Sequence, residues 1–238
     1  MADAGNISAD WYRRHAERYA QVADEWSQST WVTHSHPALT DEQAALDRLV
    51  ALAPGRCGLD VGCGAGARDV YRLMLAGYDV TGIDTIEENI ALARTRHPEI
   101  AARVSVHDIR EPLPFADASF DFAFCNSVIQ HLEPKALYGV TLPEVARVLR
   151  PDGALQLIFK CGSGVLTIED PDYGAERSFR LYEPDEMIAR LAELGLALVR
   201  PWAAGEMGGV LHCEDHRRID TCVMWVQQGG PLRDSRDL

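Results

Sequence analysis

An acidic residue followed by three closely spaced glycines is the stretch of this sequence best suited to chemistry. Asp60 opens the run Asp-Val-Gly-Cys-Gly-Ala-Gly, in which Gly62, Gly64 and Gly66 follow a short apolar segment and precede a helical pattern. Glycine accepts positive φ and lets a ligand lie against the main chain, while N–H groups at the start of the following helix face that ligand. The run therefore predicts a turn that binds a nucleotide.

Two kinds of nucleotide ligand fit this turn. The spacing Gly62-x-Gly64-x-x-Ala67, with Asp84 near the end of a second apolar run, matches the dinucleotide-binding fingerprint and its ribose-binding acid. The longer pattern Asp-x-Gly-x-Gly-x-Gly, which begins at Asp60, resembles instead the first motif of class I S-adenosylmethionine-dependent methyltransferases. In that family the glycines approach the methionine part of the cofactor and the acid binds its ammonium group. The resemblance implies the same roles here, and S-adenosylmethionine as the cofactor.

The resemblance extends along much of the chain. Residues 112–121, 130–132 and 147–153 look like the small-molecule branch of the methyltransferase family, and the similarity covers about residues 55–160. It implies an α/β fold, a Rossmann-like three-layer sandwich. Its sheet would have seven mostly parallel strands, the last of them antiparallel.

Acidic residues end three successive predicted strands, at Asp60, Asp84 and Asp108. Because ligands of open α/β sheets bind outside the carboxyl ends of the strands, we expect these three side chains to line one crevice. Asp84, with its neighbour Thr85, is expected to bind the ribose, while Asp108 and the backbone N–H of Ile109 bind the adenine. Each carboxylate could instead only cap a helix, but three at successive strand ends favour the cofactor.

The first residues predict a helix with one aromatic face. Its members recur at spacings of three and four residues and are Tyr12, Ala16, Tyr19, Ala23 and Trp26. This face could cover the sheet, or it could form a lid over cofactor and acceptor. The resemblance implies a lid in which Tyr19 closes over the sulfonium, and it places the cofactor's carboxylate end near Asn126. Trp31, His34 and His36 follow in a loop that could line the mouth of the pocket.

Alternating strand and helix patterns position these residues in a mostly parallel sheet. The expected strands are one beginning at residue 57 and those at residues 79–84, 104–106, 120–125, 154–159, 196–200 and 221–226. Thr85 and Glu88 predict a capping box for the helix after the second strand. An irregular stretch is expected at residues 161–182.

We expect three parts along the chain. Residues 1–54 would form an N-terminal helical cap, residues 55–226 the cofactor-binding core, and residues 227–238 a disordered tail.

Composition narrows the range of partners and locations. The formal net charge of −13 and the lack of a basic block oppose nucleic-acid binding. The chain start lacks a signal-peptide pattern, and no apolar run approaches the roughly 20 residues that span a bilayer. We therefore expect a cytoplasmic protein that is a monomer or a homodimer.

Six cysteines lie mostly in apolar runs without CxxC spacing, which predicts free thiols and no disulfide. Residues 212–216, His-Cys-Glu-Asp-His, have types that suit zinc or iron but lack paired-ligand spacing, so no metal is expected. The acids of residues 169–172, with Arg177 and Arg180, are expected on a loop surface. The alternative is that the two arginines clamp a carboxylate.

The expected reaction is methyl transfer to oxygen or nitrogen, and less readily to carbon, of a small molecule in natural-product biosynthesis. The product cofactor would be S-adenosylhomocysteine. His131 is the candidate general base, since histidine titrates near neutral pH, although it could merely order its loop. Gln130 stands where many relatives carry a second histidine, and His107 where a small residue is common. Two alternatives stay open, an RNA or protein methyltransferase and a protein that binds the cofactor without catalysis.

Overall fold

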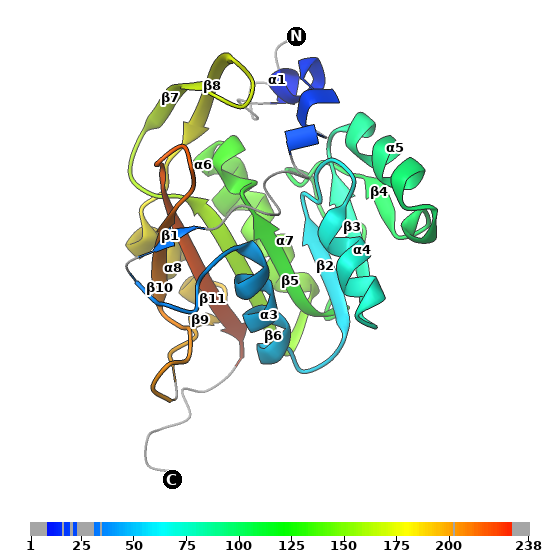
Figure 1. The fold of residues 1–238 in the computed structure, drawn as a ribbon. Helices are drawn as coiled ribbons and strands as arrows, with labels where there is room; N and C mark the ends of the chain where they lie inside the picture. Colours follow the sequence, from blue (N-terminus) through cyan, green and yellow to red (C-terminus); the bar gives the residue numbers. More distant parts are fainter. Residues whose placement is uncertain are drawn as a thin grey trace, which may run out of the picture.

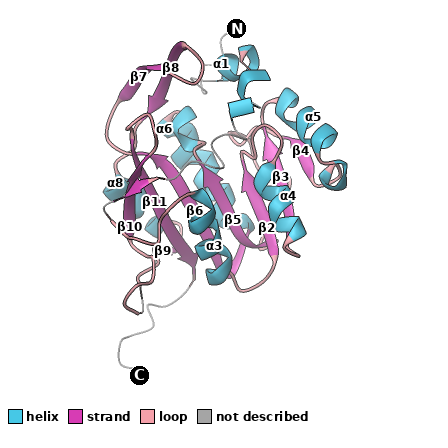
Figure 2. Cartoon of the chain, viewed as in Figure 1, coloured by secondary structure: helices cyan, strands magenta, loops and turns pink. Residues whose placement is uncertain are grey.

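The structure is a computed structural model that describes residues 9–15, 17–19, 21–22, 31–33, 35–201 and 203–229. Its centre is a nine-stranded sheet with helices on both faces (Figures 1 and 2). The strands of this sheet are β1 (Val32–Thr33), β2 (Cys57–Val61), β3 (Asp79–Asp84), β4 (Val104–Val106), β5 (Phe120–Asn126), β6 (Leu149–Lys160), β9 (Leu196–Leu198), β10 (Val210–Glu214) and β11 (Asp220–Gln228). The α-helices are α1 (Ala9–Arg14), α3 (Glu42–Leu52), α4 (Arg68–Leu75), α5 (Glu87–Arg96), α6 (Pro134–Ala136), α7 (Leu142–Val148) and α8 (Pro184–Glu193).

The strand order places a ligand crevice at the middle of the sheet. The order is β1-β10-β11-β6-β5-β2-β3-β4, and β2 to β6 pair in parallel. From β2 the chain runs to β3 and β4 on one side and then returns to β5 on the other side. The loops after β2 and β5 therefore diverge at their carboxyl ends, which is where open α/β sheets bind ligands.

The predicted fold class is confirmed, with additions at one edge of the sheet. β11 pairs antiparallel with β6, as expected for the last strand. β9 and β10 pair with opposite ends of β11, so together they fill one strand position. The two-residue β1 then adds a further strand beyond β10. Without β1, the sheet has the seven positions that the family resemblance implies.

Two hydrophobic clusters hold the three layers together. Side chains alternate across a strand, so Phe122 and Phe124 of β5 pack on one face while Ala123 and Cys125 pack on the other. Helices α3, α4 and α5 cover the first face, and α7 and α8 cover the second. Both faces of β5 are buried, as its continuous apolar sequence predicts.

The expectation of an irregular stretch at residues 161–182 was wrong. It contains a two-stranded hairpin, β7 (Val165–Asp170) and β8 (Ala175–Arg180), which stands beside α1 at one end of the molecule (Figure 1). Exposed and half-buried side chains alternate along most of β7, the pattern of a strand with one covered face. Gly174 supplies the positive φ of the connecting turn, 59°.

Two smaller expectations also need correction. The predicted capping box at Thr85 and Glu88 does not form, because Ile86 is the N-cap of α5 and its N–H donates to the Asp84 carboxylate. β11 extends to Gln228, so the first two residues of the predicted tail belong to the sheet. Residues 230–238 lie outside the described residues, as do Ala16, Ala23, Trp26 and His34. The division between cap and core at residue 54 stays a prediction.

Two of the six cysteines are paired, against expectation. Cys161 and Cys222 form a disulfide, because β6 and β11 lie side by side and bring their Cα atoms to 5.8 Å. The other four are free. His212 lies near this pair, with its Nδ1 3.8 Å from Cys222 Sγ. Among the described residues these three have ligand atoms close enough for a metal ion, but the two sulfurs are bonded to each other. The expected absence of a metal stays a prediction.

Candidate active site

The glycine turn after β2 has the conformation that its sequence predicts. Gly62, Gly64 and Gly66 have φ values of +88°, +66° and +87°. A Cβ at Gly62 would lie 2.5 Å from a methyl carbon of Val128, and a Cβ at Gly64 would lie 2.7 Å from Tyr19 Oη. Backbone conformation and close packing therefore both require glycine at these two positions.

Asp84, at the end of β3, ties this turn to the start of α5. Its carboxylate accepts hydrogen bonds from the N–H of Gly64 at 2.9 Å, the N–H of Ile86 at 2.8 Å and Asn89 Nδ2 at 3.2 Å. Burial raises the pKa of Asp84, although these three hydrogen bonds oppose the shift. A carboxylate has about four acceptor positions, so capacity for one further donor remains. The carboxylate is a structural element of the crevice as well as the predicted ribose ligand.

A small cavity of about 70 Å³ collects the residues predicted to bind the adenosine. Its lining includes Asp84, Thr85, Asp108, Ile109 and His131. Polar groups from the ends of β3 and β4 therefore meet in one place, as the sheet topology predicts. Which of them contact the cofactor stays a prediction.

Asp108 has a partner that the sequence alone did not suggest. Partial burial would raise the pKa of Asp108, but hydrogen bonds from the guanidinium and N–H of Arg110 outweigh it and lower the pKa. The side chain is therefore a carboxylate at neutral pH. Three donors of Arg110 already contact its two oxygens, which leaves about one of its four acceptor positions for an amino group such as that of adenine.

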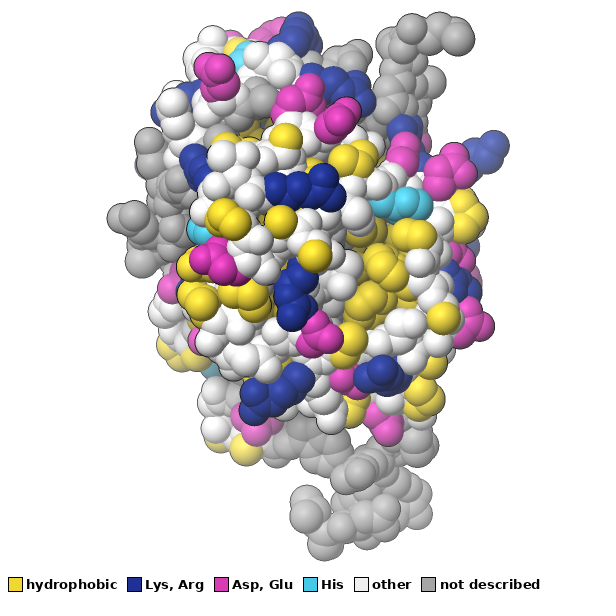
Figure 3. Space-filling model, turned by 90° about the vertical axis from the view of Figure 1, so that its right-hand side faces the viewer, with side chains coloured by type: hydrophobic (Ala, Val, Ile, Leu, Met, Phe, Trp, Pro, Cys, Tyr) yellow, Lys and Arg dark blue, Asp and Glu magenta, His cyan; other side chains and the backbone are white. Residues whose placement is uncertain are grey.

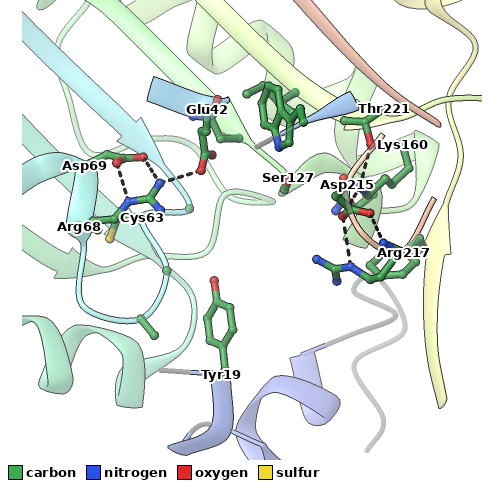
Figure 4. Close-up of a pocket in the computed structure, with 18 of the residues that line it drawn as sticks. Tyr19, Glu42, Cys63, Arg68, Asp69, Ser127, Lys160, Asp215, Arg217 and Thr221 are labelled. Atoms are coloured by element: carbon green, nitrogen blue, oxygen red, sulfur yellow. Dashed lines mark hydrogen bonds and ion pairs between the residues drawn. The ribbon is translucent and has the colours of Figure 1, made fainter. Parts of the chain in front are cut away.

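A larger cavity of about 160 Å³ adjoins the small one. The two share four lining residues, Tyr12, Tyr19, Gly62 and Ser127. Figure 4 shows two groups of charged residues on opposite sides of the larger cavity, with Tyr19 pointing in from a third side. We call these groups the acidic wall and the basic wall.

The acidic wall consists of Glu42, Asp60, Arg68 and Asp69 beside the glycine turn. Arg68 Nη2 lies 2.7 Å from Glu42 Oε2, and Arg68 Nε lies 2.8 Å from Asp69 Oδ1. Burial raises the pKa of Asp60 well above its usual range, and the neighbouring carboxylates of Asp69, Glu42 and Asp84 add to this rise. Three carboxylates against one guanidinium give this wall a negative formal charge, which suits a cationic ligand.

The basic wall lies across the cavity and consists of Lys160, Arg177 and Arg217 with the carboxylates of Asp170 and Asp215. Lys160 Nζ lies 3.4 Å from Asp215 Oδ2, and Arg217 Nε lies 3.2 Å from the same oxygen. Arg177 Nη1 and Arg217 Nη1 lie 3.2 Å and 3.1 Å from Asp170 Oδ2. Burial lowers the pKa of Lys160, although Asp215 opposes this shift.

His131 is buried in the short 3₁₀ turn Ile129–His131 that follows β5. Its Nε2 lies 3.0 Å from the hydroxyl oxygen of Tyr12, to which Arg177 also donates. Burial lowers the pKa of His131 well below its usual value, and the nearby charges of Arg177 and Lys160 lower it further. The imidazole is therefore neutral at neutral pH. It lines the smaller cavity, and Tyr12 lines both.

The remaining predicted residues divide between the site and other parts of the molecule. Asn126 and Trp31 line the larger cavity, and Asn126 Oδ1 accepts from Gln156 Nε2 at 2.9 Å. His36 instead accepts from the N–H of Ala38 within its own turn, at 3.1 Å. Tyr12 and Tyr19 line both cavities, which favours the lid interpretation of the N-terminal helix.

Sequence reasoning missed most of the charged walls. Arg68 and Asp69 directly follow the glycine turn, and Lys160 ends a strand, so their positions at the crevice edge were available signals. The expectation that Arg177 lies on a surface was wrong, because its side chain is 4% exposed in the structure. Arg180 pairs with Glu133 and is not among the residues of either cavity.

Comparisons with known proteins agree with this geometry. Residues 59–157 match the model of a methyltransferase domain. The chain is 34% identical over 183 residues to an uncharacterised 37.1 kDa protein encoded in a transposon of Streptomyces fradiae, covering 75% of this chain and 51% of that protein. It is 31% identical to the 27-O-demethylrifamycin SV methyltransferase of Amycolatopsis mediterranei, covering 59% of this chain and 55% of that enzyme. The chain thus spans about half the length of these curated relatives.

A solved structure extends the likeness to the whole fold. The 1,6-didemethyltoxoflavin-N1-methyltransferase of Burkholderia thailandensis, crystallised with its substrate and S-adenosylhomocysteine, superposes with a TM-score of 0.63 at 21% identity. The superposition covers 94% of this chain and 89% of that enzyme. The glycine turn, the strand order and the domain match together lead to one conclusion: residues 59–157 form a methyltransferase domain of the class I S-adenosylmethionine-dependent type.

Proposed function

We propose that this chain transfers a methyl group from S-adenosylmethionine to an oxygen or nitrogen atom of a small molecule. The observation that carries the proposal is the junction of the two cavities at the glycine turn. The smaller cavity gathers Asp84, Asp108 and Ile109 for an adenosine, and the larger one begins at the acidic wall and continues away from it. A bound cofactor would extend from one into the other, with its sulfur near the residues that both cavities share.

The residues present suit the chemistry of this cofactor. When bound, S-adenosylmethionine supplies a methyl group on a positively charged sulfur, and its methionine part carries an ammonium group. The acidic wall offers three carboxylates, among them buried Asp60, whose raised pKa reflects the cost of an uncompensated negative charge. A cation beside Asp60 would relieve that cost. We therefore assign the ammonium to Asp60 and the methionine backbone to Gly62, Gly64 and Gly66.

Residues near the junction of the two cavities would position the acceptor and the cofactor and remove the acceptor's proton. Tyr19 lies against Gly64 and, with Tyr12, borders both cavities, so these rings would hold the reactants in line and exclude water. His131 is neutral and can accept a proton. The Tyr12 hydroxyl is hydrogen-bonded to His131 Nε2, and Tyr12 also lines the larger cavity, so it would relay the acceptor's proton to the imidazole.

Size and charge support a small acceptor over RNA or a protein. The larger cavity holds about 160 Å³. On the face beside α5 and β4, Lys and Arg side chains lie among Asp and Glu side chains, and the whole chain carries a formal charge of −13 (Figure 3). A polyanion is bound by clustered positive charge. The named acceptors of the two methyltransferases compared above, a rifamycin and a toxoflavin precursor, support a role in natural-product biosynthesis.

None of the helices in the described ranges is both long and apolar enough to cross a membrane. A cytoplasmic location and a monomeric or homodimeric state stay predictions.

The test begins with ligand binding and ends with turnover. A ligand that binds only the folded protein raises its unfolding temperature, so S-adenosylhomocysteine should stabilise the chain and NAD should not. Protein incubated with methyl-labelled S-adenosylmethionine and a panel of phenols, amines and carboxylic acids should then label at least one acceptor. Stabilisation by NAD alone would overturn the family assignment. Tight binding of S-adenosylhomocysteine with no transfer to any acceptor would favour a non-catalytic binding protein.

A further inference from the structure

We propose that the methyl acceptor carries a carboxylate and that the basic wall binds it. The inference rests on the proposed function and adds the class of acceptor to it. The wall stands across the larger cavity from the glycine turn, and it is built from the end of β6, strand β8 and the turn before β11. In the sheet, β6 and β11 lie on the side of β5 away from β2 and β3, and the adenosine residues gather after β3 and β4.

The cations of the wall are buried, and they share their counterions. The side chains of Lys160, Arg177 and Arg217 are 6%, 4% and 8% exposed. Within the described ranges, the carboxylates that pair with these three cations are Asp170 and Asp215, and each bridges two of them through one oxygen. The five described side chains of the basic wall therefore sum to a positive formal charge on this side of the cavity. A buried positive charge next to an empty space favours an anionic ligand.

Other titratable groups around the wall do not alter this balance at the cavity. His216 also lines the cavity, and its Nε2 lies 2.9 Å from Asp172 Oδ2 as a separate pair. Thr221 accepts a hydrogen bond from Lys160 Nζ at 2.8 Å and adds no charge. The acidic wall lies on the opposite side of the same cavity (Figure 4). An acceptor with one anionic end would thus be oriented along the cavity, its carboxylate away from the acids and its other end toward the cofactor.

Aromatic side chains fix the position of the central arginine. The guanidinium carbon of Arg177 lies 4.9 Å, 5.0 Å and 4.7 Å from the ring centres of Trp11, Tyr12 and Phe179. Contacts of this type stabilise the cation and restrict its rotamers. Tyr12 and Phe179 also line the cavity, so the same rings would pack against the apolar part of the acceptor. A guanidinium held in place in this way loses little entropy when it binds a carboxylate.

The competing explanation is that the basic wall binds the carboxylate of the cofactor itself. The cofactor carries an ammonium and a carboxylate on the same carbon atom, so both groups lie close together. The acidic wall would take the ammonium, and that wall contains its own guanidinium, Arg68. The experiment below separates these two uses of positive charge.

The test uses matched ligand pairs on the full chain saturated with S-adenosylhomocysteine. Acetate is compared with acetamide and benzoate with benzamide, because each pair has nearly the same shape and differs in charge. Binding is measured by calorimetry and by the shift in unfolding temperature, for the wild type, Arg217→Gln, Lys160→Gln and the control Arg190→Gln. Arg190 is 47% exposed on α8 and pairs with Glu193.

In at least one pair, the carboxylate should bind at least about tenfold more tightly than the amide. A charge-assisted hydrogen bond accounts for an affinity difference of this size. Arg217→Gln and Lys160→Gln should remove this preference and leave S-adenosylhomocysteine affinity unchanged, while Arg190→Gln keeps both. Equal stabilisation within each pair, including none by any probe, would overturn the proposal. So would a loss of S-adenosylhomocysteine affinity in the two wall variants, since the wall would then serve the cofactor. Failure of the wild type to bind S-adenosylhomocysteine would instead refute the proposed function.

Discussion

The acidic and basic walls face each other across one cavity, yet the chain assembles them in different ways. Three of the four acidic-wall residues, Asp60, Arg68 and Asp69, lie within ten positions of one another around the glycine turn. The basic wall joins residues from β6, the β7–β8 hairpin and the turn before β11. The match to the methyltransferase domain ends at residue 157, before the first residue of the basic wall. Apart from Glu42, the acidic wall lies inside the matched region, whereas the basic wall lies outside it.

The comparison predicts that substitutions in the two walls have separate effects, and the largest effect should come from His131 in the smaller cavity. In His131→Gln, methyl transfer should fall about 10²–10⁴-fold, since a general base is removed. The affinity for S-adenosylhomocysteine should stay within about threefold. Single-turnover rates and calorimetry measure the two quantities. His97→Gln is the control, because His97 stacks on Tyr71 away from both cavities. An unchanged transfer rate would show that His131 only orders its turn.

Asp84→Ala should damage the cofactor side in two ways. The affinity for S-adenosylhomocysteine should fall about 100-fold with the loss of a charged acceptor and of the ordered turn. The free energy of unfolding should also fall, by about 2–4 kcal/mol, because buried donors at Gly64, Ile86 and Asn89 lose their acceptor. Calorimetry and urea unfolding measure these changes. Asp79→Ala, on the same strand but 73% exposed, should change neither by much.

Intact affinity in Asp84→Ala, together with the expected loss of stability, would show that Asp84 is purely structural and that the ribose is held elsewhere.

Asp60→Asn should separate binding from stability. The affinity for S-adenosylhomocysteine should fall about tenfold, because a carboxylate opposite the ammonium becomes neutral. The protein should be as stable as the wild type or more so, since burial disfavours the Asp60 charge. Asp117→Asn, 79% exposed, is the control. A stable Asp60→Asn variant with full affinity would move the ammonium away from the acidic wall.

The smallest effect concerns pH. The folded pKa of His131 is lowered, so the unfolded chain takes up this proton first as the pH falls below about 6.5. Below that pH the wild type should lose up to about 1.4 kcal/mol per pH unit relative to His131→Gln, until the folded pKa is reached. Comparing the two proteins removes the opposite contribution of Asp60 and Asp84, whose pKa values are raised. Parallel stability curves between pH 7 and pH 5 would contradict the buried, neutral imidazole.

The sequence predicted what depends on local pattern. The positive φ of Gly62 and Gly64 and the strand end at Asp84 follow from residue types that restrict the backbone nearby. The third strand ends at Val106, two residues before Asp108, and the antiparallel last strand is what the family resemblance implied. A continuous apolar run and a glycine turn keep the same meaning wherever they occur in such a fold.

Features that depend on tertiary contacts could not be predicted from the sequence. The Cys161–Cys222 disulfide requires β6 and β11 to be neighbours, and Glu42 meets Arg68 only because α3 and α4 cover the same face of the sheet. Arg177 resembles a surface residue in an acid-rich stretch until the hairpin folds against α1 and buries it. A stretch of charged side chains usually indicates an exposed loop, because such side chains are buried only when they are paired.

A crystal structure of the full chain with S-adenosylhomocysteine tests the division of the cavity most directly. We predict the adenosine in the small cavity, the amino group beside the carboxylate of Asp60, and the sulfur near Tyr19 with the basic wall free of the cofactor. A homocysteine part bound to Lys160 and Arg217, or an adenosine outside the cavity of Asp84 and Asp108, would contradict the assignment of the two walls.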